Sequence, residues 1–154
     1  MRWEQGRATI EQMLADGELQ RVPASRRQAD RLLDQAHHHL DSATQVRDED
    51  PAGGYALAYD AARKALAAIL ENQGLRATSR GGHLAIIEAV RAQLDPPMGG
   101  ILRRFNRMRM RRNEAEYPPT DAPELTPDDV QEDEGKAVQI IELAARLLDQ
   151  MSPF

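Results

Sequence analysis

The side chains with the clearest chemical potential lie in the run from residue 109 to residue 118, RMRRNEAEYP. Here Arg112 is followed at once by the polar Asn113, and the phenol of Tyr117 comes five positions after Arg112. A guanidinium group can bind a phosphate through two parallel N–H bonds, and an amide or a phenol can add further hydrogen bonds. We therefore take this run as the candidate site of the chain. A second interpretation stays open for Arg112, because Glu116 is four positions away and can form an ion pair with it along a helix.

The same region carries most of the concentrated positive charge of the chain. Residues 103–112 contain six arginines and no acid, whereas residues 121–134 contain seven acids and no base. The two segments could neutralise each other within one molecule or across a dimer, or the first could form a local basic face. On the second interpretation the candidate RNA or phosphate contacts are Arg104, Arg107, Arg109 and Arg111.

The histidines are weaker candidates for a metal or anion site. Three of them are consecutive at 37–39, where neighbouring side chains on a helix point about 100° apart and cannot converge on one metal ion. His83 follows Gly81 and Gly82 at an expected helix start, where backbone amides can hold an anion, but the lysine and the spacing of a phosphate loop are missing and a simple turn is the favoured interpretation. The chain has no cysteine, which removes thiolate ligands. We expect neither a metal site nor a cofactor.

The elements that must position these residues are all helices. Apolar residues recur at three- and four-residue spacing, and no segment alternates in the manner of a strand. We predict an all-α fold, a compact antiparallel bundle of about five helices in residues 26–154, preceded by an extension of residues 1–25 with one short helix. The expected helices span about 7–16, 29–46, 55–70, 84–94, 98–117 and 126–151, and a breaker at 48–54 separates the second from the third.

Composition limits the classes of function. The net charge of −5 argues against a protein whose whole surface tracks nucleic acid, so binding of a polyanion would have to be local. No apolar run of membrane length or signal-peptide type is evident. The expectation is a cytoplasmic protein without a membrane partner.

Two segments together resemble the HEPN family, the higher eukaryotes and prokaryotes nucleotide-binding domain. They are the tyrosine-containing helix YALAYDAARKAL at residues 55–66 and the run at 109–118, and the likeness extends over about residues 26–151. The resemblance implies a helical bundle that dimerises and carries Arg, a polar residue, a few spacers and His near the end of its last-but-one helix. Arg112 and Asn113 match the first two positions of this motif, so the resemblance implies that the candidate catalytic residues are Arg112, Asn113 and Tyr117. Tyr117 stands where the family has His, and a phenol with a pKa near 10 is a poor proton acceptor at neutral pH.

The resemblance also implies a function. Many HEPN proteins are metal-independent ribonucleases of toxin–antitoxin or phage-defence systems, often paired with a small nucleotidyltransferase. We expect a component of such a module that engages RNA or a nucleotidyltransferase-type partner through its Arg-rich helix, as a homodimer, with weak or no ribonuclease activity because the motif His is absent. Two alternatives are an active metal-independent endoribonuclease, in which Tyr117 or His83 replaces the missing His, and a non-catalytic structural homodimer.

Overall fold

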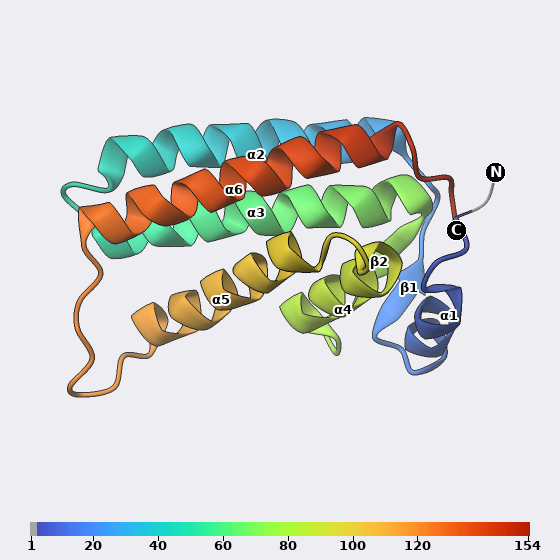
Figure 1. Ribbon diagram of the computed structural model, residues 1–154, viewed down its shortest axis with the longest axis horizontal. Helices are drawn as coiled ribbons and strands as arrows, with labels where there is room; N and C mark the ends of the chain where they lie inside the picture. The colour runs from blue at the N-terminus through green and yellow to red at the C-terminus, as the bar shows by residue number, and fades with distance from the viewer. Residues whose placement is uncertain (1–2) are drawn as a thin grey trace.

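The computed structural model describes residues 3–154, and Figure 1 shows helices surrounding one central helix, α3. In chain order the elements are α1 (Arg7–Ala15), β1 (Leu19–Arg21), α2 (Arg26–Val46), α3 (Pro51–Gln73), β2 (Leu75–Ala77), α4 (Gly82–Leu94), α5 (Gly99–Glu116) and α6 (Pro127–Leu148). Helices α2 and α6 lie side by side along one side of α3, while α4 and α5 pack on the other side (Figure 1). The predicted helical bundle is therefore confirmed.

Helix α3 can occupy the centre because its side chains are small or apolar around most of its circumference. The alanines listed below are fully buried and let neighbouring helices approach closely. Larger side chains, among them Tyr55, Tyr59 and Leu66, fill the remaining space and are also fully buried. The buried alanines are Ala58, Ala61, Ala62, Ala65 and Ala68.

Side-chain caps fix where the long helices begin. Ser25 accepts a hydrogen bond from the amide of Gln28 at the start of α2. Thr126 and Asp129 form a capping box at the start of α6, as the sequence pattern around Thr126 predicts in part. Gly74 ends α3 in the left-handed conformation, with φ of 83°, which a side chain would disfavour.

Two expectations about local structure were wrong. The segment 48–54 is not a breaker throughout, because α3 already begins at Pro51 and contains both following glycines. Asp50 caps this helix by accepting from the amide of Gly53, and proline is well tolerated in a first turn. A sheet is also present: β1 pairs antiparallel with β2, with Leu19 opposite Ala77. Three-residue strands are too short to show an alternating pattern.

The segment before α2 belongs to the same packed structure. Ile10 and Met13 of α1, together with Leu19 of β1, are buried in the common core. Helix α1 packs against α4, and β1 is paired with β2, which follows α3 directly. Within residues 3–154, no helix combines the length and the apolar character needed to cross a membrane.

Candidate functional site

The arginines of α5 have three different environments. Arg103 and Arg107 are exposed, and among residues 3–154 neither forms an ion pair. Arg104 is also exposed and donates to the side-chain oxygen of Gln139 on α6 at 2.7 Å. Of the four arginines predicted as RNA or phosphate contacts, Arg104 and Arg107 are thus exposed, whereas Arg109 and Arg111 are partly buried.

Arg111 instead belongs to a buried polar network, which we call the Asp133 network (Tyr55, Arg111, Asp129, Asp133 and Lys136). Asp133 is 1% exposed. It accepts hydrogen bonds from the Tyr55 hydroxyl and from Arg111 Nη1, the latter at 3.3 Å, and lies 2.7 Å from Lys136 Nζ. Arg111 also pairs with Asp129 at 3.5 Å. The basic and acidic segments therefore neutralise each other at this point, where Arg111 has two carboxylate partners.

A second polar group lies one helical turn along α3, where Tyr59 faces α4 and α5. The Tyr59 hydroxyl and His83 Nδ1 are 2.9 Å apart, and the two rings lie 5.6 Å apart between centroids. The other side of the tyrosine is stacked on Phe105 of α5 at 5.5 Å. These contacts fix the orientation of the His83 ring, which stands in the first turn of α4.

Arg112 completes this group from α5. Its guanidinium carbon lies 5.7 Å from the centroid of the Tyr59 ring, a distance typical of a cation–π contact. Its Nη2 atom forms an ion pair with Glu116 at 2.8 Å, so the helical ion pair considered from the sequence is present. Its Nε atom is buried and has no hydrogen-bond partner among the described residues. Arg112 thus retains a donor that the chain itself does not satisfy.

Further charges surround the pair formed by Tyr59 and His83. Arg63 on α3 lies 3.3 Å from Asp60, and Arg109 on α5 donates to the side chain of Asn106 at 3.2 Å. We name the whole set the His83 cluster: Tyr59, Asp60, Arg63, His83, Arg109 and Arg112.

The electrostatics of the cluster keep both central groups neutral. Burial lowers the pKa of His83, and the positive charges of Arg63 and Arg112 lower it further. Burial raises the pKa of Tyr59 to about 12, although the same two arginines oppose this shift. At neutral pH the cluster therefore contains a neutral imidazole and a protonated phenol beside three guanidinium groups.

The structure separates the three residues of the sequence motif. Arg112 turns toward Tyr59, whereas Asn113 is exposed. Tyr117 follows the last residue of α5 and is 79% exposed. In a single chain, the residue at the position of the family's His thus lies in solvent, and the histidine that shares a cluster with Arg112 is His83.

The sequence pointed to only part of this cluster. The sequence identifies His83 by its place after two glycines and as a replacement for the motif His, and it places Tyr59 in the core. Arg63 had no assigned role. Its spacing of four from Tyr59 was a visible local signal, because such residues are neighbours on one helix face. The contacts of Tyr59 with α4 and α5 depend on packing between distant segments.

The remaining histidines do not form a site with one another. His37 and His38 are exposed on α2, while His39 Nε2 lies 2.7 Å from Lys64 Nζ on α3. Burial, followed by the charge of Lys64, lowers the pKa of His39. In the part of the chain that the structure describes, no three His, Asp or Glu side chains gather in a way that would hold a metal ion.

Comparisons with protein-family models, with curated proteins and with solved structures found no match to this chain. A function therefore has to be inferred from its residues and their geometry.

Proposed function

We propose that the chain is a HEPN-type protein that binds RNA through the phosphate-binding groups of the His83 cluster. The observation that carries the proposal is the buried Nε atom of Arg112, a charged donor without an acceptor. A buried donor that stays unpaired costs about 1–3 kcal/mol. The Arg112 side chain is 26% exposed, so a phosphate that binds its exposed end and turns the guanidinium outward would satisfy a donor that the fold leaves unsatisfied. Arginine is well suited to this role because its N–H groups match the spacing of phosphate oxygens.

The charges of the cluster favour an anionic ligand. Arg109 is hydrogen-bonded only to a neutral amide, while Arg63 and Arg112 each have one carboxylate partner. Three guanidinium groups thus meet two carboxylates, which leaves a positive excess at the site. The phenol of Tyr59 is stacked on Phe105 and therefore serves to position His83 rather than to stack on a base.

The exposed arginines of α5 would extend the binding surface along the RNA backbone. Arg103, Arg104 and Arg107 lie one to two turns before Arg112 on the same helix. Contacts of this kind are electrostatic and are weakened by salt, and the net charge of −5 opposes approach of RNA elsewhere on the molecule. Binding should accordingly be modest and strongly salt-dependent.

The resemblance to HEPN proteins supplies the biological setting of the proposal. In this proposal the chain is a cytoplasmic component of a toxin–antitoxin or phage-defence module. It forms a homodimer whose interface involves α5, and its partner is a nucleotidyltransferase-type protein. Ribonuclease activity is slow or absent in this reading, because Tyr117 is a poor proton acceptor and lies exposed at the end of α5.

Binding is tested by fluorescence anisotropy with a 5′-labelled single-stranded RNA over a series of salt concentrations. We expect Arg112→Ala to raise the Kd by about tenfold, which corresponds to about 1.4 kcal/mol for one lost charged contact. Arg31→Ala is the matched control, because Arg31 is an exposed arginine on α2, outside the cluster. Equal affinities for wild type, Arg112→Ala and Arg31→Ala would contradict the proposal.

A second candidate function is metal-independent RNA cleavage with His83 in place of the motif His. It is favoured by the neutral imidazole held beside Arg112. His83 would accept the proton of a ribose 2′-hydroxyl while that oxygen attacks the adjacent phosphorus and the 5′-oxygen leaves and takes up a proton. Cleavage that persists in EDTA and is lost in His83→Gln, while RNA binding remains, would support this activity over binding alone.

A further inference from the structure

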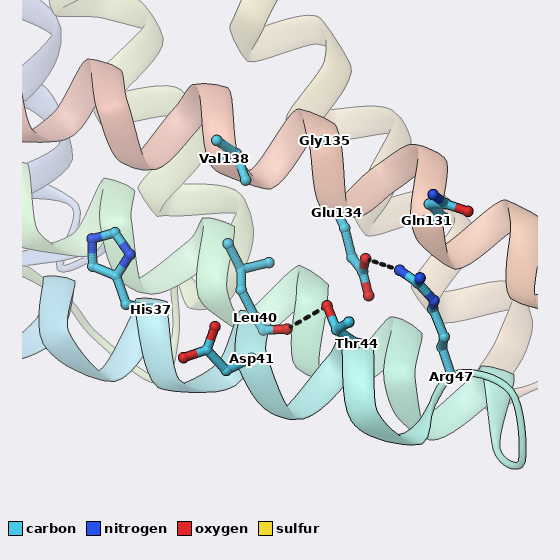
Figure 2. Close-up of a pocket in the computed structure, with 9 residues that line it drawn as sticks. All are labelled: His37, Leu40, Asp41, Thr44, Arg47, Gln131, Glu134, Gly135 and Val138. Atoms are coloured by element: carbon cyan, nitrogen blue, oxygen red, sulfur yellow. Dashed lines mark hydrogen bonds and ion pairs between the residues drawn. The ribbon is translucent and has the colours of Figure 1, made fainter.

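A groove of about 410 Å³ lies between α2 and α6 (Figure 2). Figure 2 shows side chains from both helices lining it. Those used below are Leu40, Asp41 and Arg47 of α2, and Glu134, Gly135 and Val138 of α6.

The packing within a single chain does not explain why residue 135 is a glycine. Gly135 lies inside α6, and a Cβ atom added at this position would meet nothing within 4 Å. Glycine inside a helix costs about 0.5–1 kcal/mol relative to alanine, so the packing of this molecule does not require it. Because residue 135 has no side chain, another chain can approach the backbone of α6 closely at this position in the groove.

The groove also carries unsatisfied negative charge. Glu134 is 9% exposed, and its Oε2 atom pairs with Arg47, while its Oε1 atom is buried without a hydrogen-bond partner. Asp41 is exposed on the opposite wall and forms no ion pair within residues 3–154. Two carboxylates thus face a single arginine that is already paired.

Apolar side chains lie beside these charges. Val138 is 42% exposed, one turn from Gly135 on α6, and Leu40 lines the wall formed by α2. The groove therefore fits a helix that combines positive charge with an apolar residue.

The chain itself presents such a surface on α5. Arg103, Arg107 and Met110 are spaced four and three residues apart, so they share one face of the helix. All three are exposed, Met110 by 51%, and neither arginine has an ion-pair partner in the described part of the chain. Within one molecule α5 packs against α6 through other side chains, such as Arg104 and Arg111, which leaves this face exposed.

We propose that the α5 face of one copy binds in the α2–α6 groove of a second copy. Arg103 and Arg107 would pair with Asp41 and Glu134, and Met110 would pack on Leu40 and Val138 close to the backbone of Gly135. A contact between two different surfaces leaves one face of each kind unused, so copies would add in a line or close into a ring in place of the homodimer proposed above. In the assembled form Arg103 and Arg107 would contact protein instead of RNA. A two-fold contact between two grooves is disfavoured because it would bring carboxylates together.

The test uses two variants that each block one surface. Gly135→Trp fills the groove, where the structure leaves room for a side chain, and Arg103→Glu/Arg107→Glu reverses the charge of the α5 face. In sedimentation velocity at low salt, wild type should show a mass that grows with protein concentration, and each variant alone should be a monomer. An equimolar mixture should form a dimer and no larger species, because each variant retains the surface that the other lacks.

Two controls keep the result interpretable. Circular dichroism establishes that the variants are folded, and Asp41→Lys is a second groove variant in case Gly135→Trp is unstable. Arg27→Glu/Arg31→Glu reverses a matched pair of exposed arginines on α2 and should assemble as wild type does. The proposal is overturned by a wild type that is monomeric throughout, by a mixture that stays monomeric, or by a dimer that Gly135→Trp and Asp41→Lys do not affect.

Discussion

Tyr55 and Tyr59 lie one helical turn apart on α3, and each lies near one of the adjacent arginines Arg111 and Arg112 of α5. The polar groups around the two pairs differ. Tyr55 and Arg111 both donate to the buried carboxylate of Asp133. Tyr59 and Arg112 also approach each other, but the side chain that hydrogen-bonds to Tyr59 is the imidazole of His83 on α4 rather than a carboxylate.

In our account, the carboxylate of Asp133 makes one of these groups a structural contact, whereas the group without it at the corresponding place is a binding site. In the Asp133 network the charge of Arg111 is balanced by two acids, and the network links α3, α5 and α6. In the His83 cluster the Nε donor of Arg112 stays unpaired. Similar residues on the same two helices therefore serve stability in one place and, in our account, binding in the other.

The largest effect is expected where the Asp133 network loses its acceptor. Asp133→Ala leaves the Tyr55 hydroxyl and the charges of Arg111 and Lys136 without their shared partner, so the free energy of unfolding should fall by about 3 kcal/mol. Urea denaturation followed by circular dichroism measures this change. Asp128→Ala, at an exposed position in the first turn of α6, should cost less than about 1 kcal/mol. Similar losses in both variants would show that the network is not the source.

Arg111→Ala separates stability from binding. Arg111 is 37% exposed, so loss of its contacts should lower the free energy of unfolding by only about 1 kcal/mol. The affinity of the Arg111→Ala variant for RNA should stay within about twofold of that of wild type, which corresponds to less than about 0.5 kcal/mol. A loss of RNA affinity as large as that of Arg112→Ala, in a folded protein, would remove the distinction between the two regions.

The pH dependence of stability should report on His83. Because its pKa is lowered in the folded chain, the unfolded chain binds the proton more readily as the pH falls through about 6.5. The free energy of unfolding should therefore be higher at neutral pH and decrease below about pH 6.5.

His83→Gln should reduce this slope, and so should His39→Gln, since the pKa of His39 is lowered as well. Urea midpoints measured on both sides of pH 6.5 test the expectation. A slope left unchanged by both substitutions would mean that these imidazoles are not neutral in the fold.

The smallest effect is expected at Tyr117, which lies outside both regions. Tyr117→Phe removes only an exposed hydroxyl, so stability should change by less than about 0.5 kcal/mol and the Kd for RNA by less than about twofold. A clear loss of RNA affinity would show that Tyr117 acts in the site after all, for example across an interface between copies.

The helices could be predicted from the sequence because apolar spacing is a local property. The stripe of α3 and the capping residue Thr126 both identify elements that the structure contains. The three-residue strands could not be predicted, since β1 forms only by pairing with β2, which is more than fifty residues away in the chain.

The candidate site was predictable to a smaller degree. Arg112 and its ion pair with Glu116 follow from spacing along one helix. The separation of Arg111 from Arg112 does not, because it depends on α6 placing Asp133 beside one of two adjacent arginines. The orientation of His83 toward Tyr59 likewise depends on how α4 packs against α3.

In our account the His83 cluster binds RNA because the side chain bonded to Tyr59 is a neutral imidazole, whereas the side chain bonded to Tyr55 in the Asp133 network is a carboxylate. The most direct measurement is the RNA affinity of His83→Glu beside that of His83→Gln, each confirmed to be folded. His83→Glu adds a carboxylate that competes with phosphate for the surrounding arginines, so its Kd should rise by about tenfold or more, whereas His83→Gln should stay within about threefold of wild type. Equal affinities for the two variants would contradict the account.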